Sequence, residues 1–126
     1  MELCLKSVES AIENIDAEII VVDNNSKDGS CNMVKTLFPK VKVIANNKNH
    51  GFSKGNNIGV SQAQGEYLCI LNPDTVVSED TFFKLLKFAK TRIISELLVV
   101  SLLMEGVHFY LKVSVKFLML KQPLRS

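Results

Sequence analysis

Residues 66–75, EYLCILNPDT, form a short apolar run that stops abruptly at Pro73. Gly65 bounds the run on its other side, and a short apolar run between two such residues is typical of a buried strand. A strand that is buried on both faces is typical of a parallel sheet flanked by helices. Ligands of such sheets bind beyond the carboxyl ends of the strands. The sequence therefore places the carboxylate of Asp74 where open α/β sheets carry out their chemistry.

The length and composition of the chain are those of one modest globular domain. Its 126 residues are 47% hydrophobic and 22% charged, which is ordinary for a soluble protein and sufficient for a hydrophobic core. The net charge of +2 is too small to indicate nucleic acid or an acidic membrane surface as a partner. We therefore expect no nucleic-acid partner. We also expect no signal peptide, and no apolar run is long and uninterrupted enough for a membrane segment.

The cysteines indicate a reducing compartment. Cys4, Cys31 and Cys69 form no Cys-x-x-Cys pair, and together with the two histidines they make no zinc pattern. Thiols at such spacings are typical of buried, reduced cysteines in cytosolic proteins. We therefore expect a cytoplasmic protein, and leave open whether it attaches to the inner face of the membrane.

Helical and strand patterns alternate along the chain as far as about Lys90. The spacing of apolar residues predicts helices at about 3–14, 30–38, 53–64 and 78–90. The run that ends before Pro73 is one predicted strand, and β-branched runs predict two more, at 18–23 and 41–44. The residues expected to cap the later helices are Ser30, Ser53 and Ser78. Alternation of this kind predicts an α/β layer with parallel strands.

The same spacing predicts which helical side chains face the sheet. In the helix near 53–64 we expect Ile58 and Val60 to point inward. The inward face of the last helix is expected to comprise Phe82, Leu85, Leu86 and Ala89.

A glycine-rich polar run, GFSKGNN at residues 51–57, stands at the start of the third predicted helix. A helix start offers free backbone N–H groups and the positive end of the helix dipole to a phosphate. The run is not a Walker loop and lacks the dinucleotide-binding fingerprint. The alternative interpretation is an ordinary helix start whose glycines serve the turn.

Two aspartates, Asp23 and Asp74, follow apolar strands, and Asp28 lies in the loop after the first of them. In a parallel sheet the side chains of Asp23 and Asp74 would emerge at the same edge. Carboxylates on one rim can hold Mg²⁺ or Mn²⁺ between two phosphates, or accept hydrogen bonds from a base or a ribose. The alternative is that each aspartate merely begins a turn. Their combination with the glycine-rich run favours a ligand site.

Residues 18–90 resemble the nucleotide-sugar-binding half of inverting family 2 glycosyltransferases, and most closely the rhamnosyltransferase-like members. The resemblance rests on EIIVVDNNSKDGS at 18–30, NHGFSKGNNIG at 49–59 and LNPDT at 71–75, in the expected order and at the expected spacing. It implies a GT-A fold, whose Rossmann-like sheet binds a nucleoside-diphosphate sugar such as a UDP- or dTDP-sugar. It also implies a glycan or lipid-linked acceptor and a role in cell-surface polysaccharide biosynthesis.

The resemblance also implies roles for individual residues. Asp23 would contact the nucleobase or the ribose. Asn72-Pro73-Asp74 would occupy the Asp-x-Asp position, with Asp74 as the ligand of a divalent metal, Mg²⁺ or Mn²⁺. Asn72 replaces the first aspartate and is a weaker ligand, which puts the metal dependence in question. The residues implied in binding the nucleotide sugar are Asp23, Asn25, Asp28, Gly51, Lys54, Asn57, Asn72 and Asp74.

The chain departs from the family pattern at both ends. The family's opening strand, which lies in mid-sheet, has no counterpart, so we expect the neighbouring strands to lack backbone partners. The resemblance stops near Lys90, and the general base of the family and its acceptor-binding elements also have no counterpart. We therefore expect residues 1–90 to form a partial nucleotide-sugar-binding domain without a catalytic residue, inactive alone.

Residues 91–126 form an apolar tail unlike the family, and from Val107 onward it fits helical and strand patterns poorly. We hypothesise that the tail is a frameshift product. Back-translation permits a peptide resembling the usual family continuation when reading starts at the third base of the Thr91 codon. The alternative is a divergent helical tail.

Three functions are compatible with these residues. The leading interpretation is a truncated glycosyltransferase that retains the donor-binding half. The alternatives are a nucleotidyltransferase-like enzyme on the same type of sheet and a non-catalytic α/β nucleotide-binding module.

Overall fold

The computed structural model describes residues 1–91, 107–108 and 116–121 of the chain. Helices and strands alternate along most of this length. The elements are α1 (Glu2–Ala11), β1 (Glu18–Asp23), α2 (Ser30–Leu37), β2 (Lys42–Ala45), α3 (Phe52–Gln62), β3 (Leu68–Leu71), α4 (Thr81–Thr91), β4 (Val107–His108) and β5 (Lys116–Lys121).

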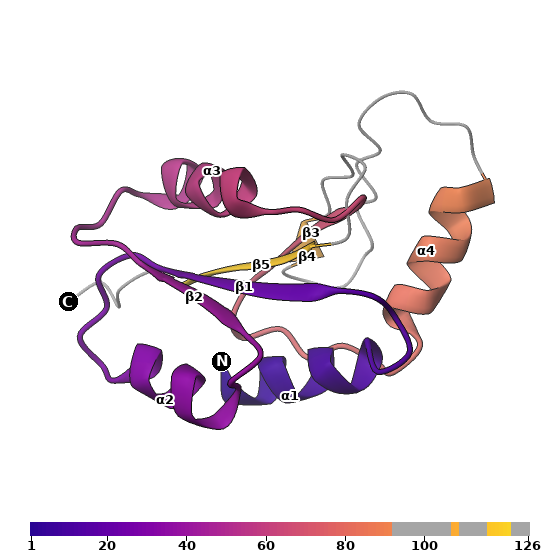
Figure 1. The fold of residues 1–126 in the computed structure, drawn as a ribbon, viewed down its shortest axis with the longest axis horizontal. Coiled ribbons are helices and arrows are strands. Elements are labelled where there is room, and N and C mark those ends of the chain that lie inside the picture. The colour runs from indigo at the N-terminus through magenta and orange to yellow at the C-terminus, as the bar shows by residue number, and fades with distance from the viewer. Residues whose placement is uncertain (92–106, 109–115, 122–126) are drawn as a thin grey trace.

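The described strands form one mostly parallel sheet, in the order β2-β1-β5-β3-β4. β1 is parallel to both β2 and β5, and β5 is parallel to β3. Only β4, among these strands, runs antiparallel to its neighbour. In Figure 1, α3 lies above the sheet, and α1 and α2 lie below it. The prediction of an α/β fold with a mostly parallel sheet flanked by helices is therefore confirmed.

Both faces of β1 are buried, because its side chains alternate between the two helical layers. Ile19 and Val21 belong to the core cluster on the α1 and α2 side. Ile20 and Val22, which are both 0% exposed, belong to a second cluster that also contains residues of β3. Burial of such a side chain stabilises the fold by about 1.5–3 kcal/mol. A strand apolar on both faces belongs inside a parallel sheet.

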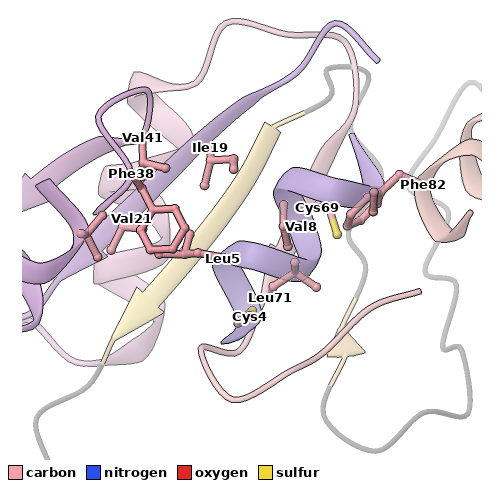
Figure 2. Packing of buried hydrophobic residues seen from close by; sticks show 12 residues of the cluster. Cys4, Leu5, Val8, Ile19, Val21, Phe38, Val41, Cys69, Leu71 and Phe82 are labelled. Atoms are coloured by element: carbon pink, nitrogen blue, oxygen red, sulfur yellow. The ribbon is translucent and has the colours of Figure 1, made fainter. Parts of the chain in front are cut away.

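Helix α1 carries its apolar side chains on one face, at the spacing that the sequence predicts. Its buried residues are Cys4, Leu5, Val8 and Ala11. They form one cluster with residues of β1, α2 and β3. Figure 2 shows Val8 of this helix by Leu71 of β3, and Leu5 on the side of Phe38, which follows α2. The helix therefore spans the region between β1 and β3.

The serines that the sequence predicts as N-cap residues do not occupy that position in the structure. α2 begins at Ser30 with Gly29 as its N-cap residue, and α3 begins at Phe52 with Gly51 in that position. Both glycines have a positive φ, of 76° and 77°. Glycine adopts this conformation without steric strain, so the chain turns and enters each helix before the predicted cap. The capping roles of Ser30 and Ser53 are therefore wrong, and α4 begins at Thr81, later than Ser78.

Helix α3 faces the sheet with small residues, and the inward orientation predicted for Val60 is wrong. Its buried residues are Gly55, Asn56 and Gly59, whereas Val60 is 39% exposed. Ile58 is half-buried. Glycines permit close approach of the helix backbone to its neighbours. The inward face of α3 therefore shows no periodic apolar residues in the sequence.

The inward face predicted for α4 is confirmed. Phe82 is buried and belongs to the same core cluster as α1. Leu85, Leu86 and Ala89 are each half-buried.

The sequence predicts that the strands beside the missing opening strand of the family lack backbone partners. This expectation is wrong, because β5 pairs with both of them. β5 pairs with β1 from Glu18↔Lys116 to Asp23↔Lys121. On its other side it pairs with β3 from Leu68↔Lys116 to Leu71↔Met119. A segment of the apolar tail thus occupies the mid-sheet position. The apolar stretch at 93–104 lies outside the described residues, and the frameshift hypothesis stays a prediction that sequencing of the DNA around the Thr91 codon tests.

No helix in the part of the chain that the structure describes has the length and apolar character needed to cross a membrane.

The core packing predicts that two leucines of α1 contribute very differently to the free energy of unfolding. Leu5 is 0% exposed and Leu3 is 72% exposed. Replacement of Leu5 by Ala leaves a cavity, and we expect it to lower the free energy of unfolding by about 2–5 kcal/mol. The measurement is the midpoint of urea unfolding. The control Leu3→Ala is expected to change the free energy by less than about 0.5 kcal/mol, and equal effects of the two variants would contradict the placement of α1.

Candidate functional site

Two aspartates lie at the carboxyl edge of the sheet. Asp23 is the last residue of β1, and Asp74 follows the end of β3 in the loop that leads to α4. Because β1 and β3 both run parallel to β5, these loops leave the sheet at the same edge. The loop between β2 and α3 also starts there, since β2 is parallel to β1. Open α/β sheets bind their ligands at this edge.

Asp23 is a buried carboxylate with one oxygen still unpaired. The residue is 3% exposed, and its Oδ2 accepts a hydrogen bond of 3.1 Å from the backbone N–H of Ser26. Its Oδ1 is buried and has no hydrogen-bond partner among the described residues. Since nearly all buried polar atoms in proteins form hydrogen bonds, we expect this oxygen to accept one from a group outside the described residues. A ligand with an N–H or O–H donor would supply one.

Asn24 connects the loop after β1 with the loop before α3. The residue is fully buried, and its Nδ2 donates to the carbonyl of Gly51 at 3.0 Å. Its Oδ1 accepts a hydrogen bond of 2.8 Å from Nδ2 of Asn46. The backbone N–H of Asn46 in turn donates to the carbonyl of Asp23 at 2.9 Å. Sequence reasoning missed this connection, because a buried amide in a polar loop has no periodic signature.

The predicted residues of the loop after β1 are exposed. Asn25 has a positive φ of 65°, which asparagine tolerates better than most residues. Asp28 Oδ1 accepts hydrogen bonds from the backbone N–H of Ser30 at 3.1 Å and from its hydroxyl at 2.7 Å. The structure therefore gives both residues a role in the turn, at the same edge as Asp23.

The start of α3 presents exposed polar groups beside a buried one. Gly51, Lys54 and Asn57 are exposed. The neighbouring Asn56 is buried, and its Oδ1 has no hydrogen-bond partner among the described residues. Sequence reasoning singled out Asn57 and missed Asn56. The spacing of Gly55 and Gly59 would have indicated that Asn56 lies on the close-packed face.

The segment Asn72-Pro73-Asp74 forms a turn that α1 supports. The carbonyl of Asn72 accepts hydrogen bonds from the N–H of Thr75 at 3.1 Å and from the thiol of Cys4 at 3.6 Å. Burial raises the pKa of Cys4 to about 11, with a smaller contribution of the same sign from the carboxylate of Asp74. The thiol therefore stays protonated and can donate. Asn72 is half-buried, and Asp74 is exposed to solvent.

The two remaining cysteines differ in exposure. Burial raises the pKa of the Cys69 thiol far above its ordinary value. Cys69 is buried like Cys4, whereas Cys31 is half-buried. The expectation of buried cysteines is therefore confirmed for Cys4 and Cys69 and wrong for Cys31.

The donor set at this edge fits a metal ion only if a ligand completes the coordination. Among the described residues, no three His, Cys, Asp or Glu side chains gather closely enough to hold a metal. Asp74 is an exposed carboxylate, and Asn72 precedes it by two residues. Mg²⁺ is commonly bound by one or two carboxylates together with substrate phosphates. The residues present therefore fit a cation that is shared with a diphosphate.

A cavity of about 740 Å³ lies at the opposite edge of the sheet. Its lining includes Asp16 from the loop before β1, Tyr67 from the entry to β3, and Lys87 and Lys90 from α4. None of the predicted site residues lines it. The cavity is therefore separate from the aspartate edge, which is the carboxyl edge of the sheet where Asp23 and Asp74 lie.

Residues 1–95 match the family model described as Glycosyl transferase family 2. The chain is 38% identical over 79 residues to the minor teichoic acid biosynthesis protein GgaB of Bacillus subtilis (strain 168), which covers 60% of this chain and 9% of that protein. It is 30% identical over 88 residues to the succinoglycan biosynthesis protein ExoO of Rhizobium meliloti (strain 1021), which covers 68% of this chain and 25% of that protein. It is 31% identical over 87 residues to an uncharacterized glycosyltransferase of Haemophilus influenzae (strain ATCC 51907 / DSM 11121 / KW20 / Rd), which covers 67% of this chain and 34% of that protein.

The matched part of the chain spans about a third or less of the length of these curated relatives. No solved structure matches the chain significantly. The family match includes β1, α3 and β3 with their loops, and thus every residue of the aspartate edge described above. The chain therefore belongs to glycosyl transferase family 2.

Proposed function

We propose that the aspartate edge binds the nucleotide part of a nucleoside-diphosphate sugar, and that this chain is the donor-binding part of a glycosyltransferase. The observation that carries the proposal is the buried Oδ1 of Asp23, which has no partner within the described part of the chain and lies at the same sheet edge as the exposed Asp74. One carboxylate oxygen calls for a hydrogen-bond donor, and the other carboxylate is free to approach a cation. A nucleoside diphosphate offers both partners in one molecule.

Asp23 is proposed to accept a hydrogen bond from a nucleobase N–H or a ribose hydroxyl. Hydrogen bonds to charged groups contribute about 1.5–3 kcal/mol, and an unpaired buried group costs a similar amount. Its Oδ2 is held by Ser26, so the carboxylate is already oriented before a ligand arrives. Asn56 Oδ1, which is also buried and lacks a partner among the residues that the structure describes, is a second acceptor for the base or the ribose.

The diphosphate is proposed to lie between the start of α3 and Asp74. The N-cap residue of α3 makes no side-chain cap hydrogen bond among the described residues, so the backbone N–H groups of the first turn and the positive end of the helix dipole can face a phosphate, and the exposed Lys54 adds a positive charge. A divalent cation shared between Asp74, Asn72 and the phosphates would stabilise the leaving diphosphate during sugar transfer. The role of the chain's own residues is to bind and orient the nucleotide.

Asn24 is proposed to hold the two halves of this site together. Its hydrogen bond to the carbonyl of Gly51 fixes the loop after Asp23 to the N-cap residue of α3. The nucleoside-binding and phosphate-binding groups therefore keep one geometry, which lowers the ordering cost of binding.

The relatives suggest the wider reaction. Two of them are named for the biosynthesis of minor teichoic acid and of succinoglycan. We propose a UDP- or dTDP-sugar as the donor, with a glycan or lipid-linked acceptor at the inner face of the membrane, as in the rhamnosyltransferase-like subgroup. The general base and the acceptor site are proposed to lie outside these residues, so the chain alone binds nucleotide without turnover.

The buried aspartate gives the first test of this function. We expect Asp23→Asn to weaken UDP or dTDP binding by about 10- to 100-fold, because the neutral amide accepts a weaker hydrogen bond. Isothermal titration calorimetry measures the affinity, and circular dichroism confirms the fold. The control Asp16→Asn, at the opposite edge, is expected to bind like the unchanged protein. Equal affinities for all three proteins would rule out Asp23 as a nucleotide contact.

The exposed aspartate gives a test of the shared metal. We expect Mn²⁺ to strengthen binding of UDP or dTDP to the unchanged protein, and Asp74→Asn to abolish this strengthening while leaving metal-free affinity nearly unchanged. Titrations with and without Mn²⁺ separate the two effects. The control is Asp80→Asn, another exposed aspartate of the same connection, whose partner is Lys84. A Mn²⁺ effect that survives in Asp74→Asn would show that Asp74 is not the ligand.

The amide link gives a test of the site's framework. Asn24→Ala removes the hydrogen bonds to Gly51 and Asn46, and we expect a loss of about 1–3 kcal/mol in the free energy of unfolding together with weaker nucleotide binding. The control for the unfolding measurement alone is Asn25→Gly, because glycine accepts the positive φ of that position and should change stability by less than about 1 kcal/mol; the control for the titration is Asp16→Asn, as above. The measurements are urea unfolding and the same nucleotide titration. A variant lacking Asn24 that is stable and binds normally would contradict the role of the link.

A further inference from the structure

The centre of the sheet is occupied by a strand that lies outside the family match. The match ends at residue 95, whereas β5 comprises Lys116–Lys121. β5 is paired along all six of its residues with β1, and along its first four with β3. β1 and β3 have no register pairs with each other. The two strands are thus joined in the sheet only through β5, among the residues that the structure describes.

The two sides of this central position are built by residues 1–91. On one face of the sheet, a single core cluster contains Leu5 and Val8 of α1, Val21 of β1 and Leu71 of β3. Figure 2 shows the β5 arrow running between Ile19 and Val21 on one side and Leu71 on the other. The Cys4 thiol further attaches α1 to the carbonyl of Asn72, just after β3. Helix α1 therefore holds β1 and β3 one strand apart.

The other face of this position is also covered by residues of the family match. Ile20 and Val22 of β1 share a cluster with Leu68 and Ile70 of β3, against which Ala63 at the end of α3 packs. A strand placed here is covered on both sides, so it needs apolar residues on both of its faces. Residues 116–121, KFLMLK, provide four consecutive apolar residues between two lysines.

We propose that the gap between β1 and β3 is an acceptor site for one parallel strand, and that residues 116–121 of the same chain fill it as a separable donor strand. Vacating the gap would leave the facing backbone N–H and C=O groups of two buried strands unpaired. The donor belongs to the same chain as the acceptor, to which residues 92–115 join it. A free peptide with the donor's sequence is therefore expected to bind the same gap, as in β-strand addition.

The native Cys69 permits a direct test in the full chain. Its register partner on β5 is Phe117, whereas Leu118 is the partner of Ile70. Neighbouring strands lie about 4.8 Å apart, within the Cα separation of about 4.4–6.8 Å that disulfides span. In a background with Cys4→Ala and Cys31→Ser, we expect Phe117→Cys to form a disulfide with Cys69 under mild oxidation. The control Leu118→Cys is expected to form none.

Non-reducing electrophoresis and peptide mapping identify the product. A disulfide within the monomer for Phe117→Cys alone supports the proposal. Equal cross-linking of the two variants, or none in either, overturns it. A disulfide-linked dimer overturns the assignment to the same chain and shows that a second copy supplies the strand.

A second test uses a full-length chain with the donor strand disabled. Leu118→Pro removes a backbone donor and is not accommodated in a central strand. We expect hydrogen exchange of the β1 and β3 amides to lose its protection, and the synthetic peptide of residues 114–123 to restore it. The control peptide carries the same proline. If protection is unchanged in Leu118→Pro, or if both peptides or neither restores it, the acceptor site is excluded.

Discussion

The fold depends on pairing both edges of two strands that are buried on both faces. Residues 19–22 of β1 and all of β3 are buried, so their backbone groups have little access to water. β2 satisfies one side of β1, but β4 covers only Ile70 and Leu71 of β3. β5 pairs with the remaining side of each strand. This single arrangement fixes the parallel direction of the strands and the distance between them.

The candidate site follows from that arrangement. Because β1 and β3 are aligned through β5, the loops that carry Asp23 and Asp74 leave at one edge of the sheet. Gly29 and Gly51 then adopt positive φ values, so α2 and α3 begin at that edge, a short loop beyond the strands that precede them. Asn24 fixes the first loop to the start of α3. Oδ1 of Asp23 has no hydrogen-bond partner among the described residues, and in the proposed complex a donor group of the nucleotide would supply one.

The sequence was most informative where burial and periodicity coincide. The β-branched run at 18–23 predicts β1 to the residue, and the apolar spacing predicts the covered face of α4. The face of α3 could not be predicted, because glycine packing replaces apolar packing there, and Asn56 was missed for the same reason. The site roles implied by the resemblance stay predictions, whereas the sheet edge at which these residues gather follows from the direction of the strands. The insertion of β5 could not be predicted, since no local pattern tells between which strands a segment lies.

The position of β5 is compatible with either origin of the tail. A central parallel strand needs about five or six residues without proline, apolar on both faces, at the end of a connection long enough to reach. KFLMLK meets these conditions by composition, so a frameshifted tail and a selected one would satisfy them equally. The chemistry of the edge, in contrast, resides in residues 23–74, which the family match contains. The site therefore depends on β5 for the alignment of its strands, and on the matched residues for the nucleotide binding that we propose.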